Sequence, residues 1–200
     1  MGIAEKKADK RKRLMNAAYE YFSEQGPWDA TINDICKKAG VAKGTFYLYF
    51  NNKEALYLSL VDAISNDICN EIEREIRLRK CSTPEEIMCT VIDKYNEIMT
   101  GDIGMLKFLR GQMNWPGADS YSGLVMRLKD AILQAETDAK QAEALIIKLL
   151  SVLGMMGNVL FSSLTYGSPS SPERCVEAVK EISSEIIHSV LGGSPNFMGE

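Results

Sequence analysis

The sequence predicts an all-α protein, and three observations support this fold class. Apolar residues recur at helical spacing along nearly all of the 200 residues. No run alternates between apolar and polar residues with the period of two that a half-buried strand requires. A hydrophobic content of 46% and a charged content of 25% are typical of a soluble globular chain with a real core. We expect a three-helix N-terminal domain followed by a larger helical bundle.

The first helix is expected at residues 9–25. Its apolar positions follow the i, i+3, i+4, i+7 spacing of one helix face. They are Leu14, Ala17, Ala18, Tyr21 and Phe22. The dipeptide Gly26-Pro27 ends the helix, because neither residue favours a helix interior.

A second and a third helix follow within residues 31–50. Thr31 and Asp34 have the T-x-x-D spacing of a capping box, so the second helix begins there. Gly40 suits the left-handed conformation that ends many helices. The third helix runs through Phe50 after a short break. A helix, a tight glycine-containing turn and a second short helix form a helix-turn-helix.

The third helix has two chemically different faces. On a helical wheel Phe46 and Phe50 point together toward the first two helices, whereas Gly44, Tyr47 and Leu48 point the opposite way. An ordinary small bundle would account for the two phenylalanines as core but gives no structural reason for an outward tyrosine. Exposed Tyr, Thr and Lys side chains beside a glycine suit the major groove of DNA.

A long helix at residues 53–79 comes next. Its Leu and Ile residues recur every four positions from Leu56 to Ile76, so the apolar stripe drifts by about 40° at each step. The two ends should therefore bury different faces, as a helix linking two modules requires. Further helices are expected at residues 84–99, 103–112, 121–137, 139–164 and 172–191.

The charge distribution is uneven along the chain. Residues 1–53 hold ten Lys/Arg and six Asp/Glu, a net charge of +4, whereas residues 54–200 hold thirteen and twenty-one, a net charge of −8. A basic N-terminal domain can bind a polyanion although the whole chain carries −4. The run Lys6–Arg13 is either a solvated helix start or a phosphate-binding arm.

Several function classes find no support in the residues. Five scattered cysteines without a C-x-x-C pair and a single histidine indicate reduced thiols, with no metal site, cofactor or disulfide framework. No nucleophile–base pair is evident, so we expect no catalytic residues and no enzyme. The apolar run Leu145–Leu164 is interrupted by Lys148 and Asn158, which favours a buried helix over a membrane span. No signal peptide is evident, and a cytoplasmic location is expected.

Residues Gly26–Tyr57 closely resemble the DNA-binding region of the TetR family of bacterial repressors. The resemblance rests on the order of Gly40, Val41, Gly44, Tyr47, Tyr49, Phe50, Lys53 and Leu56. Pro27 departs from the family pattern and should only shift a loop. Leu48 stands where a polar residue is common, which affects base readout. The resemblance covers about the first sixty residues.

The resemblance implies a helix-turn-helix domain at residues 1–52 and a ligand-binding and dimerisation domain at residues 53–200. It implies a homodimeric repressor that binds a palindromic double-stranded DNA operator and is released by a small-molecule effector. The positions that would touch DNA are Thr31, Lys43, Gly44, Thr45, Tyr47, Leu48, Tyr49 and Lys53. The last two helices would form a four-helix bundle between subunits.

An effector pocket is expected from soft and aromatic side chains of the C-terminal domain. The candidates are Met88, Phe108, Met113, Trp115, Tyr121, Met126 and Met155. Ordinary core filling is the alternative role for each of them. Two other functions stay open at this point: a ligand-independent architectural or partner-binding DNA-binding protein, and a helical-bundle enzyme. A ligand-sized cavity in the C-terminal domain would separate the first of these from a ligand-released repressor.

Overall fold

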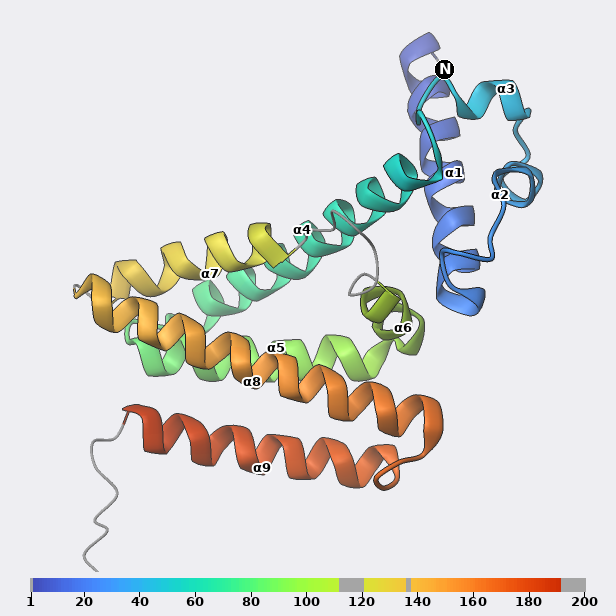
Figure 1. Ribbon diagram of the computed structural model, residues 1–200. Helices are drawn as coiled ribbons and strands as arrows, with labels where there is room; N and C mark the ends of the chain where they lie inside the picture. The colour runs from blue at the N-terminus through green and yellow to red at the C-terminus, as the bar shows by residue number, and fades with distance from the viewer. Residues whose placement is uncertain (1, 112–120, 136–137, 192–200) are drawn as a thin grey trace, which may run out of the picture. The chain divides into compact units, whose positions relative to one another are not determined.

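The structure is a computed structural model that describes residues 2–111, 121–135 and 138–191 (Figure 1). All regular elements of these residues are helices, so the predicted all-α fold class is confirmed. The helices are α1 (Ile3–Gln25), α2 (Ile32–Ala39), α3 (Lys43–Phe46), α4 (Lys53–Arg79), α5 (Pro84–Gly101), α6 (Ile103–Gly111), α7 (Tyr121–Ala135), α8 (Ala139–Tyr166) and α9 (Pro172–Leu191).

The helices form two compact units. The first unit comprises α1–α3, α4 as far as Ser65, and α6; the second comprises α4 from Asn66, α5, and α7–α9. This division differs from the expected boundary at residue 53, because the start of α4 and all of α6 pack within the first unit. Leu56 and Leu60 are buried in the core of that unit, whereas Ile68 and Ile72 are buried outside it. The two ends of α4 therefore bury different faces, as the drift of its apolar stripe predicts.

Helix α1 begins six residues earlier than predicted. The Gly2 backbone N–H donates to Glu5 Oε2 at 2.6 Å, and Arg13 lies 3.7 Å from Asp9 one turn away. The predicted start at Asp9 was wrong because Leu14 is the first buried residue described in the chain. Exposed turns carry no apolar periodicity, so the sequence pattern gave no signal for them.

Both predicted ends of α2 are present. Thr31 Oγ1 accepts the Asp34 N–H at 3.2 Å, which satisfies one free donor of the first turn. The return contact differs from a capping box, since the Thr31 hydroxyl donates to the Asp34 carboxylate at 2.5 Å. At the other end Gly40 has φ +63°, and the Val41 N–H reaches back to the Cys36 carbonyl at 3.0 Å.

Helix α3 is shorter than predicted. Regular α-helix ends at Phe46. The next residues form tighter turns, in which each N–H bonds to the carbonyl three positions before it: Leu48 N–H to Thr45 O at 3.2 Å and Tyr49 N–H to Phe46 O at 2.9 Å. The Phe50 N–H still bonds to Phe46 O at 3.0 Å. The whole stretch to Phe50 thus stays wound, although the α-helical part covers only four residues.

Aromatic rings fill the core of the first unit. Tyr57 lies against Phe22 with ring centroids 5.6 Å apart and against Phe108 at 5.2 Å. Tyr19 meets Phe108 edge-on at 5.7 Å. All but Tyr19 are fully buried, so these contacts join α6 to α1 and to the start of α4. We call Tyr19, Phe22, Tyr57 and Phe108 the aromatic cluster.

The second unit is a helical bundle around α5. A capping box begins α5, since Thr83 Oγ1 accepts the Glu86 N–H and Glu86 accepts the Thr83 N–H, both at 3.2 Å. α5 packs against α7, α8 and α9. Arg127 of α7 donates to Glu73 of α4 at 2.6 Å, and this hydrogen bond lowers the pKa of the Glu73 carboxyl.

Helix α8 is long and apolar enough to cross a membrane by length and composition alone, with 39% of its most apolar window buried. A core helix of a soluble protein passes the same test. α8 packs on α5, α7 and α9, and nine of its residues are buried. Ile147 and Met155 remain more than half exposed on its outer face.

Replacing Phe108 with alanine should lower the free energy of unfolding by about 3–5 kcal/mol, because the change empties the middle of the aromatic cluster. Urea denaturation checks this value. Leu78→Ala is the control, and its cost should stay within about 0.5 kcal/mol since the side chain is exposed. A loss below about 1 kcal/mol for Phe108→Ala would show that the ring does not hold the unit together.

Candidate nucleic-acid interface

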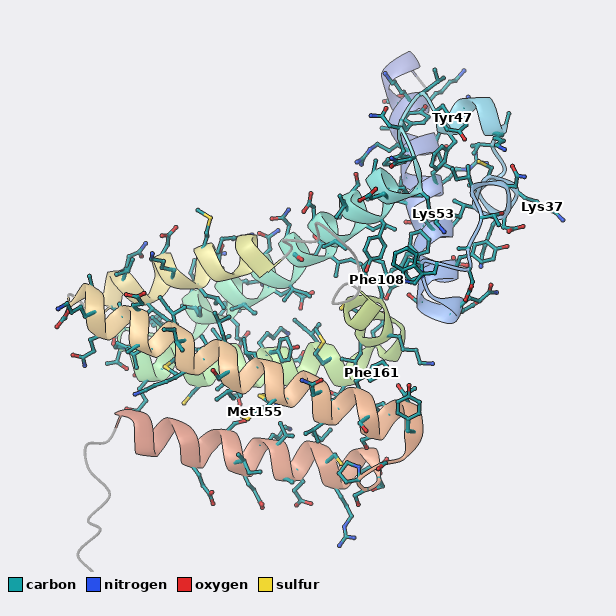
Figure 2. All side chains as sticks on the ribbon, in the orientation of Figure 1. Lys37, Tyr47, Lys53, Phe108, Met155 and Phe161 are labelled. Atoms are coloured by element: carbon teal, nitrogen blue, oxygen red, sulfur yellow. The ribbon has the colours of Figure 1, made fainter. Side chains whose placement is uncertain are left out.

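The two faces of the α3 region separate as the wheel predicts. Phe46 and Phe50 are 0% and 3% exposed, whereas Tyr47 and Leu48 are 50% and 74% exposed. Figure 2 labels Tyr47 beside α3 in the first unit. The Tyr47 ring stands edge-on to Phe46 with centroids 5.3 Å apart, so the exposed ring packs against a buried one. The buried Phe46 and Phe50 therefore hold Tyr47 and Leu48 on an outward surface, which we call the reading face.

Gly44 lies on the same surface without an internal reason to be glycine. Its φ lies outside the left-handed range, and a Cβ built there meets nothing within 4 Å. Gly40 is the opposite case, since it has φ +63° and its Cβ would lie 2.6 Å from Arg13 Nη2. Because nothing inside the fold requires Gly44, its small size leaves room for a partner that approaches the backbone of α3 closely.

Four other predicted contact residues surround the reading face. Thr31 is exposed at the N-terminus of α2, where backbone N–H groups and the positive end of the helix dipole favour an anion. Lys43 is exposed at the first position of α3. Thr45 and Tyr49 are half-buried, so only part of each side chain is available for contact. A phosphate backbone crossing this surface would meet hydroxyl, ammonium and backbone donors.

Lys53 has a structural role that the sequence did not reveal. Its Nζ donates to the backbone carbonyls of Trp28 and Ala30, both at 2.9 Å (Figure 2). Burial lowers the pKa of this ammonium group below its usual value. Two of its three donors thus hold the loop that precedes α2, and one is left for another partner.

Arg13 is a functional candidate that the sequence interpretation missed. Its Nε donates to the Ala39 carbonyl at 2.9 Å, and its Nη2 donates to the Ala39 and Gly40 carbonyls at 2.5 and 2.9 Å. A cation at the C-terminal end of α2 also complements the negative end of the helix dipole. Arg13 therefore fixes the turn that leads into α3. Its partners lie 26 and 27 residues away along the chain, so a local sequence pattern cannot predict this contact.

The described effector candidates are divided between the two units. Phe108 belongs to the aromatic cluster of the first unit, and Met88 is buried on α5 in the second unit. Met126 and Met155 are 65% and 52% exposed, which fits neither a core nor an enclosed pocket. Met113 and Trp115 lie outside the described residues, as does the side chain of Tyr121.

Replacing Gly44 with alanine should leave the thermal stability unchanged or slightly raised, because alanine favours helix by up to about 1 kcal/mol and meets no neighbour. Affinity for a DNA sequence selected by the protein should fall at least about tenfold, a loss of about 1.4 kcal/mol. Fluorescence anisotropy with labelled duplex measures this change. Unchanged affinity would show that α3 does not approach DNA at Gly44.

The family comparison matches the same part of the chain. Residues 14–60 match the model of the bacterial regulatory proteins of the tetR family. A fatty acid metabolism regulator protein of Bacillus subtilis is 34% identical over 96 residues, which are 48% of each chain. An uncharacterized helix-turn-helix transcriptional regulator of the same species, YvdT, is 42% identical over 64 residues, 32% of this chain and 33% of its own. The chain thus matches half or less of these curated relatives' lengths.

Solved structures resemble a larger part of the chain. The fatty acid degradation regulator FadR of Bacillus halodurans has a TM-score of 0.66 at 18% identity, covering 87% of this chain and 94% of its own. FadR of Bacillus subtilis, solved in complex with stearoyl-CoA, has a TM-score of 0.65 at 19% identity, covering 92% and 99%. At these identities the likeness establishes the fold. Residues 14–60 therefore carry the N-terminal domain of the TetR family, and the chain shares the fold of these solved regulators.

Proposed function

We propose that the chain is a transcriptional repressor that binds a palindromic DNA operator as a homodimer and is released by a small-molecule effector with a long apolar part. The reading face is the observation that carries the proposal. Tyr47 and Leu48 are at least half exposed while Phe46 and Phe50 beside them are buried. The fold thus holds an aromatic and an aliphatic side chain in solvent, where neither contributes to a core. Contact with bases and sugars in a major groove gives them a role.

The proposed DNA contacts follow from this surface and its charge. Thr31, Lys43, Thr45, Tyr49 and the remaining donor of Lys53 would bind phosphates, while Gly44, Tyr47 and Leu48 would face the groove. The net charge of +4 on residues 1–53 supports docking of DNA at this unit. An aliphatic Leu48 suits contact with a thymine methyl group better than a hydrogen bond to a base edge.

Homodimerisation through α8 and α9 is supported by the outer face of α8. Ile147 and Met155 are exposed there, and Ile182 is 53% exposed on α9. Between the two α8 residues lie Ser151 and Gly154, and a Cβ at Gly154 would meet nothing within 4 Å. An apolar stripe interrupted by small residues allows a helix of a second copy to approach closely. A partner helix suits this face of α8 better than lipid does, because Ser151 and Asn158 also lie on it.

A long-chain acyl-CoA is the effector class that we propose. The B. subtilis relative matched over 96 residues, well beyond the helix-turn-helix, is named for fatty acid metabolism, and a solved neighbour holds stearoyl-CoA. The interior of the second unit contains Met88, Met99 and Met156, all at most 3% exposed. Unbranched methionine side chains change conformation at low cost, which suits an interior that admits an acyl chain. The second unit would thus be the ligand-binding and dimerisation domain of a cytoplasmic protein.

The first experiment selects binding sites from a pool of randomised duplexes with the full-length chain. A homodimer with two reading faces should enrich an inverted repeat whose half-sites lie about one helical turn, 10–10.5 base pairs, or a multiple of it apart. Enrichment of a single half-site would exclude dimeric binding. A pool without enrichment would exclude a sequence-specific regulator.

The second experiment adds stearoyl-CoA to the complex of the protein with that selected duplex. We expect the apparent Kd for the duplex to rise at least about tenfold, because an effector that prefers the DNA-free state shifts the population. Free coenzyme A, which lacks the acyl chain, is the control and should have little effect. Persistent DNA binding in the presence of acyl-CoAs of several chain lengths would favour the ligand-independent architectural role.

A further inference from the structure

The first three turns of α1 project beyond the core of the first unit. In residues 3–13 every side chain that the structure describes is exposed, and Leu14 is the first to be buried. Six of these eleven residues are Lys or Arg, and two are acidic. At 1.5 Å per residue the segment is about 16 Å long. We call it the basic arm.

The charges of the basic arm are segregated around the helix. With 100° per residue and Leu14 as the reference, Lys7 and Lys10 lie within about 40° of the buried stripe, and Lys6 within about 80°. The acidic residues lie on the opposite side, with Glu5 at about 180° and Asp9 at about 140°. Lys6, Lys7 and Lys10 therefore continue the face that α1 presents to the rest of its unit, whereas Lys12 lies on the opposite side at about 160°.

Two arginine contacts place this face beside α3. The Arg11 guanidinium lies over the Phe50 ring at 5.3 Å from its centroid, just after the α3 region. Arg13 binds the Ala39 and Gly40 carbonyls, just before it. Figure 1 shows the start of α1 and α3 at the same end of the first unit. The arm is thus attached to both turns that flank α3.

The lysines of the same face are left without partners. Lys6, Lys7 and Lys10 are exposed and make no side-chain hydrogen bond or ion pair with any residue that the structure describes. The nearby acids are engaged elsewhere, since Glu5 accepts from the Gly2 backbone and Asp9 lies 3.7 Å from Arg13. The arginines thus anchor the arm to the protein, and the lysines remain available.

We propose that the basic arm is a second DNA-contacting element, in which Lys6, Lys7 and Lys10 bind phosphates that flank the groove occupied by α3. The proposal rests on the DNA-binding function proposed above. It assigns to the basic arm a separate part of the affinity for DNA that does not depend on the base sequence. Each phosphate neutralised releases counterions, so it steepens the dependence of binding on salt by about 0.9 in a plot of log K against log salt concentration.

The test compares salt titrations of the full-length protein on its selected duplex and on a random duplex. Because a homodimer brings two arms to each duplex, the variant Lys7→Gln/Lys10→Gln removes four phosphate contacts. It should flatten the slope by about 3.6 and weaken binding to both duplexes by the same factor. Lys12→Gln is the matched control, because it removes the same charge from the same helix at about 160° from the buried stripe. Its slope should equal that of the wild type. Circular dichroism melts establish that all variants fold.

Two results would overturn the proposal. One is a wild-type slope for Lys7→Gln/Lys10→Gln, which would make the arm a solvated helix. The other is equal flattening per charge by Lys12→Gln, which would mean that only net charge matters.

The variant Arg13→Ala should affect specificity and leave the salt dependence unchanged, because it loosens the turn before α3. The ratio of affinities for the selected and random duplexes should fall, while the slope of log K against log salt concentration stays that of the wild type. A wild type that binds no duplex would refute the proposed function itself, whereas normal selection with an unchanged slope refutes only the arm.

Discussion

The contact between the Arg13 guanidinium and the carbonyls at the end of α2 is the interaction on which the reading face depends. Helix α3 is only four residues long and has little stability of its own. Its position is set by Phe46 and Phe50 in the core and by the Gly40 turn that Arg13 holds. The left-handed φ of Gly40 strains any other L residue at that turn, and a Cβ there would lie 2.6 Å from Arg13 Nη2 and displace the guanidinium. Contacts with the rest of the unit thus hold the short helix at both ends.

Cations in this unit divide into those that hold the fold and those that face solvent. Arg13 and Lys53 donate to backbone carbonyls at the two ends of α2, and Lys38 pairs with Glu20 of α1. Lys37 and Lys43 are exposed, and Figure 2 shows Lys37 extending away from α2. Net charge alone therefore overstates the number of groups available for phosphates. It still explains how an acidic chain can present a basic surface at one end.

The sequence predicts most of the fold because helices with caps and apolar stripes leave strong local signals. The bounds of α4 and α9, the Thr31 cap and the separation of Phe46 from Tyr47 all follow from such signals. Two features could not be predicted. The early turns of α1 bury nothing, so no periodicity marks them. The contacts of Arg13 and Lys53 join residues more than twenty positions apart, and only the folded chain brings them together. The sequence analysis assigned Phe108 to the C-terminal domain, but α6 packs on α1 in the first unit, and this long-range packing leaves no local signal either.

The most direct test of the reading face is the substitution Tyr47→Ala. The ring is half exposed and packs edge-on against Phe46, so the variant should melt within a few degrees of the wild type. In gel-shift titrations it should lose specific binding to the selected duplex and retain the weak, salt-sensitive binding to random duplex. Unchanged affinity for the selected duplex in a folded variant would contradict the assignment of α3 as the element that reads DNA.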